Sequence, residues 1–310
     1  MSILFYCNWQ NKQEWIESIK NKFKSEKIYI WPHIKDLDSI NYAIVWEMPY
    51  GQLAKCKNLK IIFALGAGVD HLLKDPNLPK VPIVRLKDSL MAKRMSNYVQ
   101  GQILNFQLNI LQYYENMKKK KWLEQPNIID NHEISVGVLG IGFIGTIIAK
   151  DLSKNGYKVL GFKSTKPNQK LHFPIYYHNN SLNKFISHCN IIVNCLPSTS
   201  RTKNFINTNF LKKMKRNALL INIGRGDTVN EDHLRKFLIK NKKFNVVQDV
   251  FKKEPLKKNH PLWKEKNIFI TPHIAGITSI KSAINQIYKI YSLHKKNGEL
   301  KNLVNINKEY

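Results

Sequence analysis

Short apolar runs alternate with longer amphipathic stretches along most of this 310-residue chain. A continuous apolar run is typical of a strand buried on both faces of a sheet, and an apolar period of 3.6 residues is typical of a helix. The N-terminal part contains apolar runs at residues 3–7, 28–30, 43–46, 61–64 and 83–86. Because helical patterns such as residues 12–23 lie between these runs, we predict a parallel sheet with helices on both faces.

A second alternating block begins at Ile134 and is long enough for a complete dinucleotide-binding domain. Its apolar runs lie at residues 136–139, 158–162, 191–194, 218–222, 244–249 and 268–271. Six parallel strands joined by helices are typical of the Rossmann fold. The predicted fold class is therefore α/β, with two doubly wound parallel-sheet domains. One is a Rossmann dinucleotide-binding domain and the other is a flavodoxin-like substrate domain.

Two long helical patterns decide how the chain is divided. One covers residues 96–112 and keeps its apolar residues on a single stripe. The other begins after Thr278, which we expect to be its N-cap, and it follows the last predicted strand. We therefore expect the chain to return to its first domain. The predicted division is a discontinuous substrate-binding domain of residues 1–97 and 279–310 and a dinucleotide-binding domain of residues 98–278.

A glycine-rich turn separates the first strand of the second block from the helix that follows it. Its sequence is Gly-Ile-Gly-Phe-Ile-Gly, and the glycines permit a tight turn, close approach of a pyrophosphate, and close packing of helix on strand. The helix N-terminus supplies backbone amides for the phosphates. A turn that binds nothing is the alternative, but the surrounding strands favour a nucleotide site. The residues expected to contact the cofactor here are Gly140, Gly142, Phe143, Ile144 and Gly145.

The end of the second strand of this block indicates which cofactor binds. An NAD site usually places Asp or Glu there, about 20 residues past the start of the glycine motif, to bind the ribose hydroxyls. This chain has Lys163, Ser164, Thr165 and Lys166 instead. Ammonium and hydroxyl groups suit a 2′-phosphate, so NADPH is favoured, with NADH as the alternative. Lysine is abundant throughout the chain, which weakens the inference from the two lysines.

The charge of the chain is strongly positive, with 50 Lys and Arg against 22 Asp and Glu and a net charge of +28. Such a charge is typical of proteins that bind nucleic acid or membrane surfaces. Only six of the 50 basic residues are Arg, however, and Lys, Asn and Ile are all used heavily. Because nucleic-acid surfaces usually combine Arg with aromatic residues, we interpret the charge as biased residue usage. We predict neither a specific nucleic-acid partner nor membrane association.

The cysteines indicate no metal site and no disulfide framework. Cys7, Cys56, Cys189 and Cys195 lack the paired spacing of metal ligands. The chain shows no secretory leader pattern and no apolar run near the roughly 20 residues that span a bilayer. We therefore expect a reducing, cytoplasmic location.

Three residues whose side chains could take part in catalysis follow neighbouring strands of the second block. Arg225, Glu254 and His273 come after the runs at 218–222, 244–249 and 268–271, and open α/β sheets bind ligands at the carboxyl ends of their strands. A hydride that reaches a carbonyl carbon leaves an alkoxide, which a His can protonate. A Glu beside the His would orient its ring, and an Arg would hold a carboxylate and polarise a carbonyl. Each residue could be structural alone, but together they favour carbonyl reduction.

The chain resembles the D-isomer-specific 2-hydroxyacid dehydrogenase family and, within it, the bacterial glyoxylate/hydroxypyruvate reductases of type A. The resemblance extends over nearly the whole length. The segments that carry it are Phe63–Asp70, Gly140–Gly145, Leu196–Thr199, the Arg225 and Glu254 segments, Pro261–Trp263, Thr271–Ala275 and Tyr310.

This resemblance assigns further roles. It gives Arg225, Glu254 and His273 the substrate-binding, His-supporting and acid–base roles already argued. It also implies that the backbone at Ala67 and Gly68 binds the substrate carboxylate. The remaining implied contacts are Trp46 in the substrate pocket, Asp249 at the nicotinamide carboxamide, and Leu196, Pro197 and Thr202 beside the cofactor.

The resemblance further implies a homodimer formed through the cofactor domain, with the polar segment around Trp122 as part of the contact. Three positions depart from the family pattern. The family commonly has Glu at the position of Asn97 and often Arg near the position of Gln107. The subfamily has Arg at the position of Ser164. The first two affect packing of the long helix, and the third affects cofactor preference.

The predicted function is NADPH-dependent reduction of glyoxylate to glycolate and of hydroxypyruvate to D-glycerate. Two alternatives stay open from the sequence. One is the same chemistry on another 2-oxo acid such as pyruvate, and the other is a non-catalytic protein that senses NAD(P).

Overall fold

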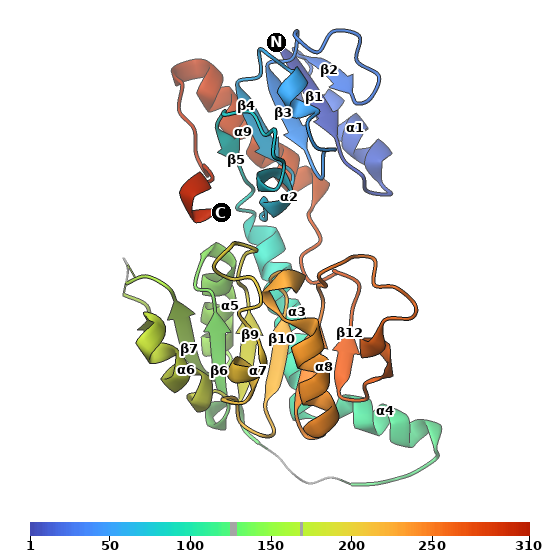
Figure 1. Cartoon of the computed structure of the whole chain (residues 1–310), viewed down its shortest axis with the longest axis vertical. Helices are drawn as coiled ribbons and strands as arrows, with labels where there is room; N and C mark the ends of the chain where they lie inside the picture. The colour runs from blue at the N-terminus through green and yellow to red at the C-terminus, as the bar shows by residue number, and fades with distance from the viewer. Residues whose placement is uncertain (125–128, 168–169) are drawn as a thin grey trace. The chain divides into compact units, whose positions relative to one another are not determined.

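The computed structural model describes residues 1–124, 129–167 and 170–310 (Figure 1). It consists of two compact units, one formed by residues 1–91 and 278–310 and the other by residues 92–277. We call them unit 1 and unit 2. The sequence placed the first boundary after residue 97, but the division falls six residues earlier, inside helix α3 (Ser89–Gln107). Unit 1 is thus discontinuous in sequence.

Unit 1 is built on a five-stranded parallel sheet with the strand order β2-β1-β3-β4-β5, which is the flavodoxin-like order. Its strands are β1 (Ser2–Tyr6), β2 (Lys27–Ile30), β3 (Tyr42–Val45), β4 (Ile61–Ala64) and β5 (Ile83–Val84). Its helices are α1 (Lys12–Lys22), α2 (Asp70–Leu73) and α9 (Ile280–Asn297). Alternate strand residues face opposite sides, so Phe5 packs with α1 and α9 while Leu4 packs in a second core with Leu72 of α2.

Helix α9 returns the chain to unit 1 and buries an apolar stripe that includes Ile284, Ile287 and Tyr291. The sequence placed its N-cap at Thr278, but the helix begins one residue later, after Ser279. The Thr278 side chain instead contacts the sulfur of Met91, with its hydroxyl 3.8 Å from Sδ.

An ion pair between an exposed lysine and a buried carboxylate ties α9 to the segment before β2. Glu26, whose side chain is 2% exposed, lies 2.8 Å from the ammonium of Lys295. Burial acts to raise the pKa of Glu26, but the hydrogen bond and charge of Lys295, with the terminal amine, outweigh it and lower the pKa to about 2. The contribution of Glu26 to stability is therefore complete above its unfolded-state pKa and lost as the pH falls toward 2.

Replacing Glu26 by Gln is expected to lower the free energy of unfolding by about 2 kcal/mol at pH 7, because Lys295 loses a charged acceptor. Urea unfolding at pH 7 and pH 3 measures this, and the difference from wild type should shrink at the lower pH. Glu299→Gln is the matched control, since Glu299 forms an exposed pair with Lys301 that is worth less than about 0.5 kcal/mol. A Glu26 effect equal to the control's would contradict the assignment.

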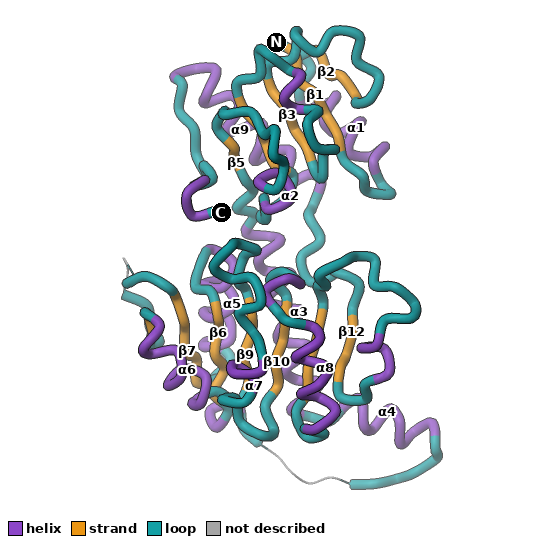
Figure 2. The backbone as a smooth tube through the Cα atoms, viewed as in Figure 1, coloured by secondary structure: helices purple, strands orange, loops and turns teal. Residues whose placement is uncertain are grey.

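Unit 2 is built on a seven-stranded parallel sheet with the order β12-β11-β10-β9-β6-β7-β8. Figure 2 shows its strands with helices on either side. Its strands are β6 (Ser135–Leu139), β7 (Lys158–Lys163), β8 (Ile175–Tyr177), β9 (Ile191–Asn194), β10 (Leu219–Asn222), β11 (Asn245–Gln248) and β12 (Ile268–Ile270). Its helices besides α3 are α4 (Ile110–Lys118), α5 (Phe143–Lys154), α6 (Leu182–His188), α7 (Thr208–Leu211) and α8 (Glu231–Lys240).

The two faces of this sheet carry separate cores. Residues of α3 and α5 pack on one face, and residues of α6, α7 and α8 pack on the other. The predicted α/β class with two doubly wound parallel sheets is thereby confirmed. The sequence missed β8, whose three residues are only half-buried or exposed at the sheet edge.

The predicted helix at 96–112 is wrong at both ends. Helix α3 begins at Ser89 and ends at Gln107, and Asn109 adopts the left-handed conformation with φ 53° before α4 starts. Ile110, an apolar residue inside the predicted helix, is 49% exposed as a result. Among the described residues, no helix is long and apolar enough to cross a bilayer.

Candidate active site

The glycine turn lies where the strand order of the unit 2 sheet reverses. Strand β6 has β9 on one side and β7 on the other, and ligands of open α/β sheets bind outside the carboxyl ends of strands at such a point. Gly140 has φ +102°, which favours glycine. A Cβ on Gly145 would lie 2.1 Å from the Gly140 carbonyl oxygen, so α5 can pack this closely only with glycine there.

Gly142 differs from the other two glycines because a Cβ there would meet no protein atom within 4 Å. It is exposed, and it is the N-cap of α5 without a side-chain cap. The amides of Phe143 and Ile144 in the first turn can therefore serve an anionic ligand, which the positive end of the helix dipole also favours. This open glycine side and uncapped helix start fit a dinucleotide pyrophosphate.

The end of β7 has the polar character that the sequence predicted. Lys163 is half-buried, and Ser164, Thr165 and Lys166 are exposed. No carboxylate occurs among these four residues. The segment therefore fits a 2′-phosphate better than a free ribose hydroxyl.

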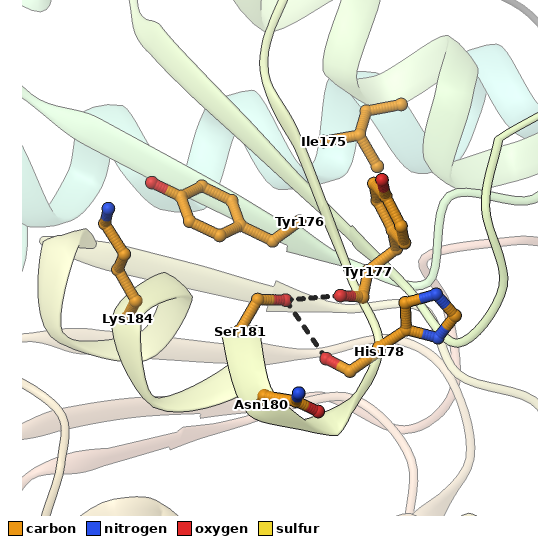
Figure 3. A pocket seen from close by; sticks show the side chains of 7 residues that line it. All are labelled: Ile175, Tyr176, Tyr177, His178, Asn180, Ser181 and Lys184. Carbon is orange, nitrogen blue, oxygen red and sulfur yellow. Dashed lines mark hydrogen bonds between the residues drawn. The ribbon is translucent and has the colours of Figure 1, made fainter.

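A shallow hollow adjoins this segment at the edge of the sheet (Figure 3). It is formed by β8 and the start of α6, and Tyr177 in its wall pairs in register with Lys163. Ser181, another of its lining residues, donates its hydroxyl to the carbonyl oxygens of Tyr177, at 2.6 Å, and His178, at 3.0 Å. The hollow lies at the opposite edge of the sheet from β12, the strand that precedes His273.

The loop after β9 holds the other residues expected beside the cofactor. Thr202 donates its hydroxyl to the Pro197 carbonyl at 2.6 Å, and the Leu196 amide donates to the side chain of Asn194 at 3.2 Å. A Cβ on Gly224 would lie 2.5 Å from the Leu196 carbonyl oxygen, so this loop touches the loop after β10. Leu196, Pro197 and Thr202 are each half-buried, at the carboxyl end of the sheet.

A buried amide network that the sequence interpretation missed supports these loops. Asn194 and Asn222 are the last residues of β9 and β10 and are fully buried. The Asn194 amide donates at 2.8 Å to both the Asn222 side chain and the Thr228 hydroxyl. Gln248 ends β11 in the same way and donates to the Val250 carbonyl. The available signal was an amide residue at the end of three apolar runs.

Glu254 and His273 form a hydrogen-bonded pair at this edge. The Glu254 carboxylate lies 2.7 Å from His273 Nδ1 and also accepts the Phe251 amide at 2.7 Å. Burial acts to raise the pKa of Glu254, but the hydrogen bond and charge of His273, the Phe251 amide and the charge of Arg225 outweigh it and lower that pKa. The carboxylate therefore stays ionised and orients the imidazole, which leaves Nε2 as the ring atom that can exchange a proton.

Arg225 lies on the loop after β10 and completes the predicted group. One of its guanidinium nitrogens donates to the Gly224 carbonyl at 3.0 Å, and its charge contributes to the lowered pKa of Glu254. A Cβ on Gly226 would lie 1.8 Å from the Phe251 carbonyl carbon, so the loops after β10 and β11 are in backbone contact. The structure thus brings the Arg225, Glu254 and His273 loops together.

Asp249 clamps the loop that carries His273. Its buried carboxylate accepts hydrogen bonds from the Thr271 hydroxyl at 2.6 Å and from the amides of Ile274 and Ala275 at 2.9 and 3.0 Å. His273 has φ +54°, a conformation rare for non-glycine residues, and its amide donates to the Asp249 carbonyl. A carboxylate has about four acceptor positions, so Asp249 retains one for the expected nicotinamide carboxamide.

Tyr98 of α3 extends this clamp. Its hydroxyl lies 2.6 Å from that of Thr271, and because the Thr271 hydrogen goes to Asp249, Tyr98 is the donor. Burial raises the pKa of Tyr98 to about 12, so the phenol keeps its proton at physiological pH. The sequence singled out neither Tyr98 nor Thr271 for this position.

Tyr98→Phe is expected to lower kcat about three- to tenfold, because one hydrogen bond worth about 1 kcal/mol no longer fixes the His273 loop. The KM for the cofactor should stay unchanged. Steady-state kinetics measures both, and Tyr113→Phe on exposed α4 is the control. An unchanged kcat would show that Tyr98 does not position the loop.

Three predicted substrate contacts lie at the carboxyl edge of the unit 1 sheet. Trp46 follows β3 and packs over Gly66, where a Cβ would lie 2.2 Å from the indole ring. Ala67 and Gly68 follow β4 and are half-buried. Within the part of unit 1 that the structure describes, their amides donate to no other residue. They are thus available to an anion.

In the described chain, no group of three or more His, Cys, Asp or Glu residues is arranged to hold a metal ion. The fold and the site define an α/β protein of the dinucleotide-binding class with a hydrogen-bonded Glu–His pair after the edge strands of the sheet. The sequence model of the D-isomer specific 2-hydroxyacid dehydrogenase NAD binding domain matches residues 100–275. The chain belongs to the D-isomer specific 2-hydroxyacid dehydrogenase family, as the sequence predicted.

Solved structures resemble this chain over its whole length. A D-isomer specific 2-hydroxyacid dehydrogenase from Xanthobacter autotrophicus Py2, in complex with NADPH and MES, is 30% identical with a TM-score of 0.93. An NADPH-dependent glyoxylate/hydroxypyruvate reductase from Sinorhizobium meliloti, in complex with NADP and sulfate, is 26% identical with a TM-score of 0.93. A 2-hydroxyacid dehydrogenase described as probable, from Rhizobium etli CFN 42 with NADP, HEPES and L(+)-tartaric acid, is 25% identical with a TM-score of 0.90. Each comparison covers 100% of this chain and 99% of the other.

Proposed function

We propose that this protein uses NADPH to reduce glyoxylate to glycolate and hydroxypyruvate to D-glycerate. Membership of the family establishes NAD(P)-dependent oxidoreduction of 2-hydroxy and 2-oxo acids as the class of reaction. The observation that carries the proposal is the Glu254–His273 pair at 2.7 Å, on a loop fixed by Asp249 and beside the Arg225 loop. The Sinorhizobium meliloti reductase supports the choice of substrates.

The residues of unit 2 fit a bound NADPH. The loop at Gly140, Gly142 and Gly145 and the start of α5 would hold the pyrophosphate, and Lys163 to Lys166 would hold the 2′-phosphate. Leu196, Pro197 and Thr202 would border the cofactor, and Asp249 would accept from the carboxamide. When bound, the cofactor supplies a hydride at its nicotinamide ring. The absence of a carboxylate at 163–166 supports NADPH over NADH.

The side chains of the site then each have a task in the reduction. His273 Nε2 would donate the proton that the carbonyl oxygen needs as it gains negative charge, and Glu254 would stabilise the resulting imidazolium ring. Arg225 would polarise the carbonyl and hold the substrate. Unit 1 would act as the substrate-binding domain, with Trp46 lining the pocket and the amides at Ala67 and Gly68 binding the carboxylate.

An absorbance assay at 340 nm tests this proposal. Glyoxylate, hydroxypyruvate and pyruvate are each offered with NADPH and with NADH, and product chirality is determined for hydroxypyruvate. We expect the highest kcat/KM with glyoxylate or hydroxypyruvate and NADPH. Faster turnover of pyruvate would show that the substrate is a different 2-oxo acid from the two proposed. No oxidation of NADPH or NADH with any of the three acids would overturn the proposed activity.

We also propose a homodimer formed through unit 2. Helix α4 extends clear of the sheet in Figure 1, and it and its neighbours expose apolar side chains that are 44–91% accessible. These residues are Leu104, Leu108, Ile110, Leu111, Tyr114, Met117, Trp122 and Leu123. Exposed apolar groups gathered in one short segment are typical of a protein–protein contact. The predicted contact segment around Trp122 also includes residues 125–128, which lie outside the described residues.

Leu108→Glu combined with Met117→Glu is expected to convert the dimer to a monomer. Dimer formation would bury the two new carboxylates in an apolar contact without partners, which costs free energy. Sedimentation equilibrium at micromolar concentration measures the mass. Gln112→Glu, which adds one negative charge on exposed α4, should remain dimeric. A monomeric wild type, or a dimeric double variant, would contradict this interface.

A further inference from the structure

Arg85 is a partly buried cation that lacks a counterion in unit 1. It follows β5 directly, and its Nε atom is buried without a hydrogen-bond acceptor. Across residues 1–124, 129–167 and 170–310, no carboxylate forms an ion pair with it. Burial lowers the pKa of its guanidinium, and Tyr310 opposes that shift. A buried charge is costly unless it is paired and hydrogen-bonded, so the fold keeps a donor here that its own residues do not satisfy.

The backbone that follows Arg85 is joined to the start of the loop after β4. The Leu86 amide donates to the Gly66 carbonyl at 3.1 Å, which joins the end of β5 to the segment that contains Ala67 and Gly68. Both elements end at the carboxyl edge of the same sheet, in adjacent strands. The residue that carries the guanidinium and the segment that carries two backbone amides without acceptors therefore follow neighbouring strands at the same edge of the sheet.

The C-terminal segment covers the other side of Arg85. Its backbone is held against β5 by a bridge between Val84 and Leu303 and by the Arg85 amide, which donates to the Asn302 carbonyl at 3.1 Å. The Tyr310 ring then lies 5.8 Å from the guanidinium carbon. A cation–π contact of this kind favours the charge and limits its mobility, but it offers no acceptor for the buried Nε–H.

The use of Arg at this position also points to a planar acceptor. The chain has only six Arg among 50 basic residues. A guanidinium binds a carboxylate with two parallel hydrogen bonds, which Lys cannot reproduce. A solvated surface Arg would not bury Nε, and an Arg with a purely structural role would be expected to have a carboxylate or carbonyl partner.

We infer that Arg85, together with the Ala67 and Gly68 amides, binds the carboxylate of the 2-oxo acid. The inference rests on the proposed function and deepens it, since it gives unit 1 an anion site with its own cationic anchor. Because glyoxylate and hydroxypyruvate share the carboxylate, Arg85 contributes equally to both substrates.

The test replaces Arg85 by Gln and measures kinetics, ligand affinity and stability. The KM values for glyoxylate and hydroxypyruvate should rise by the same factor, about 10- to 100-fold, with kcat within about threefold. Calorimetric titration of the NADP-loaded protein with oxamate, a non-reacting carboxylate analogue, should show the same loss of affinity. Tm without ligand should be unchanged or higher, because an unpaired buried charge has been removed. Arg216→Gln, at an exposed position, controls for the change in net charge.

Each other outcome overturns the inference in a recognisable way. A rise in KM for hydroxypyruvate alone would place Arg85 at the distal hydroxyl, and a lower Tm with parallel loss of kcat would make it structural. Unchanged oxamate affinity would exclude carboxylate binding. If the Gln variant does not fold, Arg85→Lys is used, and it should lose affinity because the bidentate fork is lost. If wild type binds oxamate but reduces neither acid, the proposed function fails while oxamate affinity still decides the role of Arg85.

Discussion

Replacing His273 by Ala is expected to lower kcat for NADPH-dependent reduction of 2-oxo acids by about 10²- to 10⁴-fold, the usual contribution of a positioned acid. The variant loses the proposed proton donor, whose Nδ1 lies 2.7 Å from the Glu254 carboxylate. The Kd for NADPH should remain within about twofold, because the glycine loop and the end of β7 are untouched. Steady-state kinetics and a fluorescence titration with NADPH measure the two quantities.

His33→Ala is the matched control, since His33 is exposed in unit 1 and lies outside the proposed site. It should change neither kcat nor cofactor affinity. The account is contradicted if His273→Ala keeps most of its turnover, or if NADPH affinity falls as steeply as kcat. The second result would mean that His273 supports the fold of the site and does not transfer a proton.

Gly142→Ala is expected to weaken NADPH binding roughly 10- to 100-fold while leaving Tm unchanged. Its added methyl group meets no protein atom within 4 Å, and the φ of −100° is open to alanine. Any penalty must therefore come from the ligand that approaches this backbone, and overpacking by one methyl group costs about 1–3 kcal/mol. Calorimetric titration measures the affinity, and thermal unfolding without ligand measures the stability.

Gly145→Ala gives the complementary result. Its Cβ would lie 2.1 Å from the Gly140 carbonyl oxygen, which is backbone and cannot move aside cheaply. We expect a loss of stability of about 2 kcal/mol or more in the absence of cofactor. Equal NADPH affinity for Gly142→Ala and wild type would contradict the placement of the pyrophosphate at this loop.

The sequence predicted the fold well because its strands are continuous apolar runs. Of the twelve strands in the described part of the chain, eleven, including the short β5, begin and end within a few residues of predicted runs, whereas β8 was missed. Three half-buried or exposed residues at a sheet edge leave no apolar run to detect. The interruption of the α3 stripe was also invisible, because it depends on the left-handed backbone of Asn109 and not on hydrophobicity.

The candidate site was predicted as far as single residues with distinctive chemistry allow. Arg225, Glu254 and His273 stood out because each follows a strand of the same sheet, and their catalytic roles stay predictions. The supporting hydrogen bonds could not be predicted, since Tyr98 and Asp249 are joined through Thr271 from positions far apart in the chain. Arg85 was missed for the same reason: its missing counterion is a property of its surroundings in the fold.

Transfer of deuterium from the cofactor to the substrate tests whether this protein moves a hydride from NADPH to a 2-oxo acid. NADPH deuterated at both C4 positions is mixed with glyoxylate and the purified protein, and the product is analysed by mass spectrometry and NMR. The account predicts glycolate that carries deuterium at C2, formed in proportion to NADPH oxidised, with formation falling about 10²- to 10⁴-fold in His273→Ala. Glycolate without deuterium, or no glycolate from the wild-type protein, would contradict it.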